Sequence, residues 1–342
     1  MKSKILNIII VVVSICIFLS FFLFTKGLKT LINEIRTLST SWIILSALMM
    51  IMFLFFETLV LYVIIRQFHR INNLFVKCLR FEIIGQFFGA ITPFAAASHP
   101  AQLYEMSESG ISGGTGVSIL MIKFMIHQVI NIIILVLAIL FKFKYFYSKV
   151  PYFLYFCISG LVVHVMIMII ATLFLLNKKL TSTIVIYCLN LLKKVKLLKN
   201  PEETYKQLET ELKTFHKTVF MIIKYKKLCL YSSILTLLQW LAYFSIPYCI
   251  YRGFGFNYSD IFTMVAAQVF LVNFMAIIPL PGAEGGAEGG FYLIYGLFFK
   301  SGTIITAIFL WRLITYYSSI AIGSIFTLLL PNSNSSRNMN KN

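Results

Sequence analysis

Charged residues are scarce in this chain, and acidic residues are the scarcest. Asp, Glu, Lys and Arg make up 12% of the 342 residues, with 12 acidic residues against 30 basic ones. Soluble domains carry about 25% charged residues. Apolar residues instead reach 59%, and the mean hydropathy is +0.86. The composition excludes an ordinary soluble domain and indicates an all-α integral membrane protein.

Cysteine patterns that bind metals or cross-link a chain are also missing. The six cysteines show no C-x-x-C spacing and lie in or near apolar segments: Cys16, Cys78, Cys157, Cys188, Cys229 and Cys249. Neither a disulfide framework nor a zinc site is indicated. The one sizeable polar loop, 177–227, has no Gly-rich cofactor motif and no nucleophile paired with a base. We therefore predict no metal, no cofactor and no catalytic residue.

Six apolar stretches are long enough to cross a bilayer as helices. They are 5–24, 42–65, 117–141, 151–176, 228–251 and 303–330. The amphipathic stretch 28–41 is expected to lie along the interface. We predict a single membrane domain over 1–330 and a disordered Ser/Asn-rich tail over 331–342.

The net charge of +18 is carried almost entirely by loops. Loop 177–227 holds twelve lysines and four glutamates, a balance of 12 − 4 = +8. Basic loops favour the cytoplasmic side of a membrane and attract anionic lipid. We expect this loop, loop 66–80 and the N-terminus to be cytoplasmic, with membrane lipids rather than DNA as partners.

The stretch 279–290 places two carboxylates and five glycines inside strongly apolar sequence. Non-helical backbone at membrane depth survives only when it is packed in protein or lines a hydrated cavity. Ionisable residues in such a place predict a functional site. The residues expected to break the helix here are Pro279, Pro281, Gly282, Gly285, Gly286 and Gly289.

A second broken segment, 81–102, contains Pro93 and Pro100. Laid over 272–279, residues 86–93 match at Phe, Ala, Ile and Pro, which aligns Pro93 with Pro279. Paired broken segments in two halves mark the binding site of many transporters. We predict two re-entrant elements that enter from opposite faces as an inverted repeat; the alternative is two unrelated loops in an apolar chain.

Candidate head-group ligands are the polar residues in and around these breaks. The anionic candidates for a cationic head group are Glu57, Glu105, Glu284 and Glu288. Lys123 and Arg312 are candidates for a phosphate, and His127, Gln102 and Tyr104 complete the set. Lys123, His127 and Asn131 recur every four residues and share one helix face.

Structural alternatives stay open for several of these side chains. Glu284 and Glu288 could cap the helix that begins near Gly289. Lys123 could snorkel toward the interface while His127 is hydrogen-bonded in the core. Glu57 could lie shallow at a kinked end, and Gln102 and Tyr104 could serve only a loop end.

Two motif pairs carry a family resemblance. They are Ile91-Thr92-Pro93-Phe94 with Pro100-Ala101-Gln102-Leu103-Tyr104, and Pro279-Leu280-Pro281-Gly282 with Gly285-Gly286-Ala287-Glu288-Gly289-Gly290. The chain resembles the lysylphosphatidylglycerol synthase transmembrane (flippase-like) family over about residues 5–330. The resemblance implies a cell-membrane protein that moves an aminoacylated or glycosylated lipid between leaflets, which protects bacteria from cationic antimicrobial peptides.

Bifunctional relatives carry a further domain that transfers lysine from lysyl-tRNA to phosphatidylglycerol. Only twelve residues follow Leu330 here. We therefore expect a stand-alone flippase-like unit without phosphatidylglycerol lysyltransferase activity, and the family leaves room for a separate synthase partner. The alternatives are a lysyltransferase whose loop 177–227 engages tRNA, and a transporter of a polyprenyl-linked sugar.

Overall fold

The computed structural model describes residues 28–194 and 201–328, which form helices, turns and loops. The predicted first span, 5–24, and the predicted tail, 331–342, lie outside these residues. No strand occurs within the described ranges, so the all-α prediction is confirmed.

Within the described residues, five helices are long and apolar enough to cross a membrane. They are α3 (Thr40–Phe68), α6 (Gly113–Tyr147), α7 (Phe153–Leu176), α10 (Lys226–Gly253) and Ile304–Thr327. The last is assembled from α13 (Ile304–Arg312), the π-helical turn η3 (Leu313–Tyr317) and α14 (Ser318–Leu328). Five of the six predicted spans are thereby found, and the protein is a multi-pass membrane protein.

Both predicted broken segments are helical hairpins. The first is α4 (Leu74–Ala90), η1 (Pro93–Ala95) and α5 (Ser98–Glu108). The second is α11 (Ile261–Met275), η2 (Pro281–Ala283) and α12 (Gly286–Tyr295). Proline lacks an N–H donor and disfavours helical backbone in the residue before it, which is why the helices stop at these points.

The two breaks share one backbone conformation. Thr92 (φ −123°, ψ 145°) and Leu280 (φ −120°, ψ 149°) are extended, and each precedes a proline. The residues that follow these two prolines, Phe94 (φ 52°) and Gly282 (φ 58°), have left-handed backbone conformations. The equivalence is therefore Pro93 with Pro281, so the alignment of Pro93 with Pro279 was wrong by two residues. The sequence alignment matched apolar residues, whereas the backbone dihedrals around Pro93 recur around Pro281, the second proline of the Pro-Leu-Pro run.

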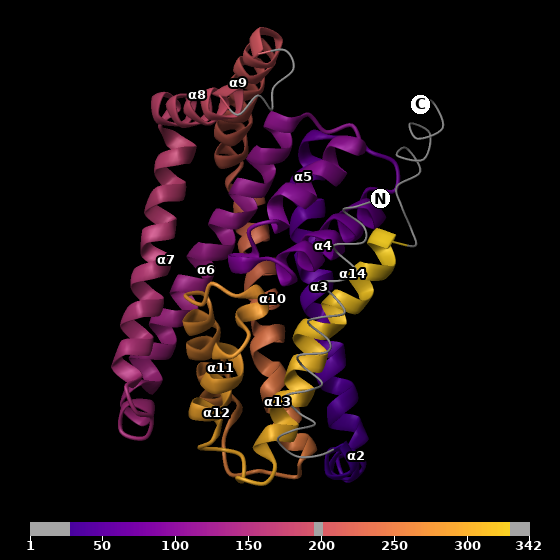
Figure 1. Cartoon of the computed structure of the whole chain (residues 1–342), viewed down its shortest axis with the longest axis vertical. Helices are drawn as coiled ribbons and strands as arrows, with labels where there is room; N and C mark the ends of the chain where they lie inside the picture. The colour runs from indigo at the N-terminus through magenta and orange to yellow at the C-terminus, as the bar shows by residue number, and fades with distance from the viewer. Residues whose placement is uncertain (1–27, 195–200, 329–342) are drawn as a thin grey trace.

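The hairpins point toward each other from opposite ends of the molecule (Figure 1). Hairpin α4–α5 occupies the half that includes α8 (Lys178–Lys194) and α9 (Pro201–Lys224), and α11–α12 occupies the other half. The tips η1 and η2 contact each other midway. The order span, hairpin, span thus occurs twice in opposite directions, as α3, α4–α5, α6 and then as α10, α11–α12, α13–α14. The predicted inverted arrangement is found.

Each hairpin packs against a span from the other half. Helix α4 packs against α14, and α11 packs against α6 and α7. Helices α3 and α10 lie along each other through the middle of the bundle. The two halves therefore interlock, because each hairpin packs against spans outside its own half.

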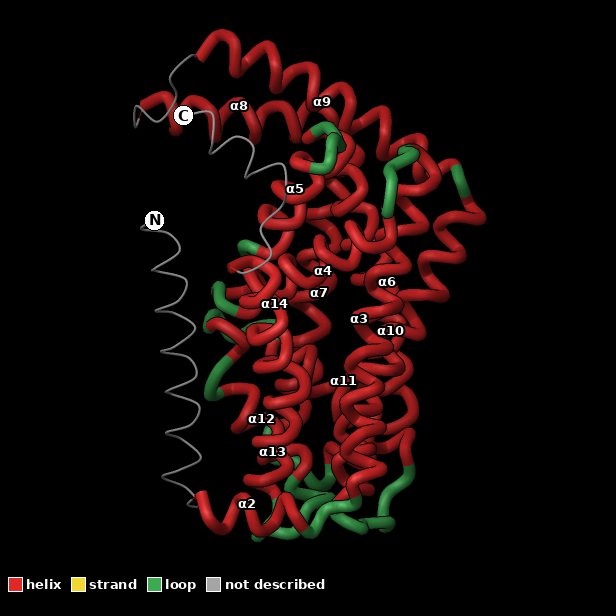
Figure 2. Tube along the Cα trace, turned by 90° about the vertical axis from the view of Figure 1, so that its right-hand side faces the viewer, coloured by secondary structure: helices red, strands yellow, loops and turns green. Residues whose placement is uncertain are grey.

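Three amphipathic helices mark the two ends of the bundle. Helix α2 (Leu28–Arg36) lies across one end, while α8 and α9 cover the other (Figure 2). The amphipathic stretch 28–41 is therefore helical over Leu28–Arg36. Helix α9 packs closely on α6, where the Gly114 amide donates to the Glu211 carboxylate and Ser118 donates to the carbonyl of Phe215 at 2.9 Å.

Candidate functional site

A first buried charge centre joins Glu57 of α3, Glu82 of α4 and Lys123 of α6. The Lys123 Nζ donates to Glu82 Oε2 at 2.6 Å and to Glu57 Oε1 at 3.2 Å. The side chains are 6%, 0% and 14% exposed for Lys123, Glu82 and Glu57. Lysine therefore does not snorkel here, because its ammonium is held between two carboxylates inside the bundle.

Amide side chains connect this first centre to the rest of hairpin α4–α5. Gln86 Nε2 donates to Glu57 Oε2 at 2.6 Å, and Gln102 Nε2 donates to Glu82 Oε2 at 2.7 Å. The Gln102 side chain can lie there because Gly85 faces it; a Cβ at Gly85 would be 2.6 Å from Gln102 Cγ. Gln102 therefore fastens α5 to the charge centre on α4.

A second charge centre lies at hairpin α11–α12. Arg312 Nε donates to Glu288 Oε1 at 2.5 Å, and Arg312 Nη1 donates to the Gly282 carbonyl at 2.9 Å. Glu288 Oε2 also accepts from the Gly285 amide at 2.7 Å, so Glu288 both caps α12 and pairs with the arginine. The half-buried Glu284 lies beside Arg312 and Tyr317.

The second centre also touches the first hairpin. Tyr316 of η3 stacks its ring 4.8 Å from the Arg312 guanidinium and donates its hydroxyl to the Ala90 carbonyl at 3.1 Å. Gly282 lets the ring come close, since a Cβ there would be 2.3 Å from Tyr316 Cε2. Tyr316 therefore contacts both the end of α4, at Ala90, and the tip of the second hairpin, at Gly282.

A cavity of about 480 Å³ lies between the two hairpin tips and α6. It is lined in part by Phe94, Ala95, His127, Asn131, Gly282 and Ala283. Asn131 Nδ2 donates to Asn273 Oδ1 at 3.0 Å, and the His127 ring lies 4.5 Å from the Trp240 ring. The polar stripe predicted on α6 thus divides, with Lys123 in the first centre and the other two side chains at the cavity.

Two other predicted ligands lie along α5, further from the hairpin tip than Gln102. Glu105 pairs with Arg80 at 2.7 Å, and Tyr104 is 58% exposed. Pro100 lies in the first turn of α5 and is exposed, as is Gly289 in α12. Pro279 precedes the break, and Gly286 opens α12. Glu105 therefore joins α5 to α4 through Arg80.

Sequence reasoning missed Glu82, Gln86 and Asn273 as parts of the site. Glu82 is the most informative omission, because its side chain is fully buried within the segment already predicted to be re-entrant. The available signal was an ionisable residue between apolar neighbours in that segment. Gln86 was used only as an alignment letter.

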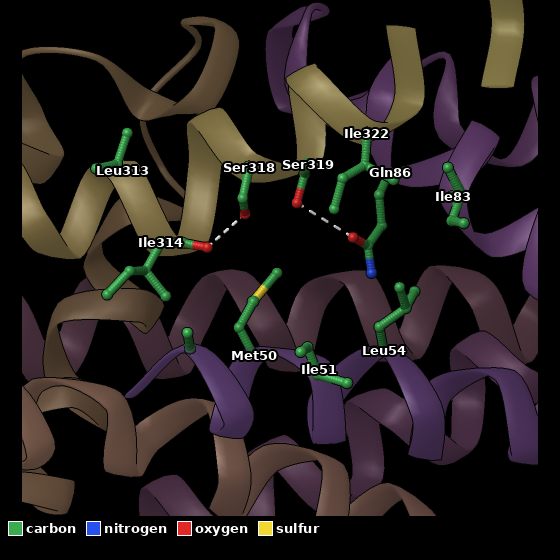
Figure 3. Close-up of a pocket in the computed structure, with 11 residues that line it drawn as sticks. Met50, Ile51, Leu54, Ile83, Gln86, Leu313, Ile314, Ser318, Ser319 and Ile322 are labelled. Atoms are coloured by element: carbon green, nitrogen blue, oxygen red, sulfur yellow. Dashed lines mark hydrogen bonds between the residues drawn. The ribbon is translucent and has the colours of Figure 1, made fainter. Parts of the chain in front are cut away.

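An apolar pocket of about 250 Å³ opens between α3 and α14 (Figure 3). Its wall includes Met50, Ile51, Leu54, Ile83, Leu313, Ile314 and Ile322. Gln86 stands at its polar edge, where Ser319 donates to its Oε1 at 3.2 Å. Since Gln86 also donates to Glu57, one side chain separates the apolar pocket from the first charge centre.

Fold and site together define a class, namely a multi-pass membrane protein with two opposed, proline-broken hairpins around a polar interior. The chain belongs to the family of the lysylphosphatidylglycerol synthase TM region, whose model matches residues 7–323. This match confirms the resemblance carried by the hairpin motifs.

Two relatives are similar to the chain. A UPF0104 membrane protein of Archaeoglobus fulgidus is 24% identical over 264 residues, covering 73% of this chain and 75% of the relative. A UPF0104 membrane protein of Methanothermobacter thermautotrophicus is 30% identical over 128 residues, covering 36% and 37%. Both relatives are archaeal, so the bacterial setting implied by the resemblance stays an expectation.

Proposed function

We propose that this protein is a lipid translocase that carries a polar head group through the space between its hairpin tips. The observation that carries the proposal is the meeting of η1 and η2, with a charge centre beside each hairpin. Broken helices that meet from opposite faces are how many transporters place a site between two access routes. The family supports a role in lipid biology without specifying the lipid.

The chemistry of the two centres suits a head group that carries both an ammonium and a phosphate. Each centre combines two carboxylates with one basic side chain. Carboxylates bind an ammonium through charge-assisted hydrogen bonds, and a guanidinium binds a phosphate. Arg312 Nη2 is buried and has no hydrogen-bond partner within the described part of the chain, which leaves a donor for phosphate oxygen. An aminoacylated phospholipid such as lysyl-phosphatidylglycerol has both groups.

The lipid tail needs an apolar surface while its head group is inside the protein. The pocket between α3 and α14 supplies one, because its wall is aliphatic and its polar edge at Gln86 adjoins the first centre. In this proposal an acyl chain lies in that pocket while the head group passes the hairpin tips.

Sidedness is part of the proposal. Following the positive-inside rule, the end covered by α8 and α9 faces the cytoplasm of the plasma membrane. Ser107 and Ser148 are exposed serines near opposite ends of α6 and form a matched pair for labelling. In a background without native cysteines, Ser148→Cys should react with an impermeant maleimide on intact cells, and Ser107→Cys only after lysis. The reverse labelling would overturn the orientation.

The central test is head-group translocation in proteoliposomes, with fluorescent lysyl-phosphatidylglycerol, phosphatidylglycerol and a glycolipid compared side by side. Glu288→Gln should slow movement at least about tenfold, because it removes a charge-assisted bond of roughly 1.5–3 kcal/mol to Arg312. Glu209→Gln, which changes an exposed carboxylate on α9, is the control.

Each outcome of this assay discriminates. Movement of the glycolipid alone would favour a sugar-linked lipid as substrate. Equal movement in wild type and Glu288→Gln would remove the second centre from the path. No movement of any lipid, together with lysine transfer from lysyl-tRNA to phosphatidylglycerol, would replace translocation by the transferase alternative.

A further inference from the structure

The first charge centre has one more negative charge than positive charge. Glu57 and Glu82 contribute two carboxylates, and Lys123 contributes one ammonium. The imbalance is localised on Glu82. Both oxygens of Glu57 accept a hydrogen bond, whereas Glu82 Oε1 is buried and has no hydrogen-bond partner in the described ranges 28–194 and 201–328.

Burying a carboxylate oxygen without a hydrogen-bond donor in a low-dielectric interior costs free energy. Taking up a proton removes the second negative charge of the centre, and this costs less than leaving a buried charge that the single ammonium of Lys123 does not balance. From the charge count and the orphaned oxygen we propose that the centre holds one exchangeable proton on Glu82 Oε1, and that this proton is coupled to lipid movement. The coupling rests on the translocase function proposed above.

The groups that face Glu82 from the surrounding helices make Glu82 the acceptor. Glu57 of α3, Cys78 of α4 and Lys123 of α6 interact with Glu82, whereas His99 of α5 and His127 of α6 interact with Lys123 and Glu57. Lys123 already donates to Glu57 Oε1 and Glu82 Oε2, and Gln86 donates to the second oxygen of Glu57. The orphaned oxygen of Glu82 is the position that a proton can take without breaking a bond.

Protonation of Glu82 would weaken the hydrogen bond that joins α5 to α4. Glu82 Oε2 accepts from both Lys123 and Gln102, and bonds to an ionised acceptor are roughly twice as strong as those to a neutral one. Gln102 is the link between α5 and α4, so a neutral Glu82 loosens the return arm of the first hairpin. An O–H bond forms at Oε1 when the proton arrives from water at one face, and it breaks when the proton leaves to the other.

The test is lipid distribution in proteoliposomes under a pH gradient, with the membrane potential clamped at zero by potassium and valinomycin. If one proton moves per lipid, the wild-type transmembrane ratio of the transported lipid should change about tenfold per pH unit. Glu82→Gln fixes the centre in a neutral form, so it should equilibrate the lipid but ignore the gradient. Glu209→Gln should respond as the wild type does.

A second readout does not depend on transport. Purified protein in weakly buffered detergent, stepped in pH beside an indicator dye, should take up about one proton more in the wild type than in Glu82→Gln. Proton uptake without movement of any lipid would refute the translocase but keep the proton site. Equal uptake in both proteins, a gradient response retained by Glu82→Gln, or accumulation driven by sodium instead of protons would overturn this inference.

Discussion

Replacing Lys123 by glutamine tests whether the first centre is held together by charge. The substitution keeps a polar side chain of similar length but removes the ammonium that pairs with both Glu57 and Glu82. Removing one partner of a buried ion pair costs about 3–5 kcal/mol, because the partner charge stays buried without compensation. Three helices meet at this ammonium, so we expect the loss to appear in global unfolding.

Lys142 provides a control on the same helix. Its Nζ lies 3.8 Å from Asp260, and the two side chains are 28% and 55% exposed. Exposed pairs of this kind contribute about 0–1 kcal/mol. Lys142→Gln should therefore leave unfolding nearly unchanged, although it removes the same charge from α6.

The assay is unfolding in detergent by titration with a denaturing detergent, followed by circular dichroism. The double variant Lys123→Gln with Glu82→Gln should recover about 0.5–3 kcal/mol of the loss, because one of the two uncompensated carboxylates is then gone. A Lys123→Gln protein within about 1 kcal/mol of the wild type would refute the charge-centre argument. A double variant less stable than Lys123→Gln alone would also refute the charge-centre argument.

The spans and hairpins could be predicted from the sequence because membrane burial requires long apolar runs, and breaks in those runs are visible locally. Apolar runs of the right length identified the spans, and prolines in apolar sequence identified the breaks. The register between the hairpins could not be obtained in this way. It depends on which proline follows an extended residue, and only backbone dihedrals at Thr92 and Leu280 reveal that.

The candidate site was predicted less completely, for a physical reason. Glu288, Arg312 and Lys123 are charged residues within apolar sequence, and the structure pairs each of them. Glu105 has the same signature but pairs with Arg80, and Glu82 became visible only when α3, α4 and α6 were packed together. Sequence shows that a charge is buried in the membrane, whereas only packing shows which counter-charge it meets.

The two centres share a construction that follows from the inverted fold. In each half the basic residue comes from the span after the hairpin, Lys123 on α6 and Arg312 on α13. In each half a carboxylate of the hairpin receives its bond, from Lys123 to Glu82 and from Arg312 to Glu288. Each ion pair therefore ties a hairpin to the span that follows it, while the tips η1 and η2 contact each other.

Glycine positions give further predictions, each with an internal control. Gly114→Ala should destabilise the contact of α6 with α9, because its Cβ would lie 2.2 Å from the backbone oxygen of Glu211. The control Gly113→Ala should be tolerated, because its Cβ would meet nothing closer than 3.6 Å. Equal thermal stability of the two variants would contradict the packing of α9 on α6. Gly282→Ala should lower stability by about 1–2 kcal/mol for its left-handed backbone, with a further loss from displacing the Tyr316 ring. Phe94 holds the equivalent left-handed position at the other tip and is 62% exposed, so Phe94→Gly should relieve strain and leave stability equal or higher by thermal unfolding in detergent. If Phe94→Gly destabilised the protein as much as Gly282→Ala, the equivalence of the two tips would fail.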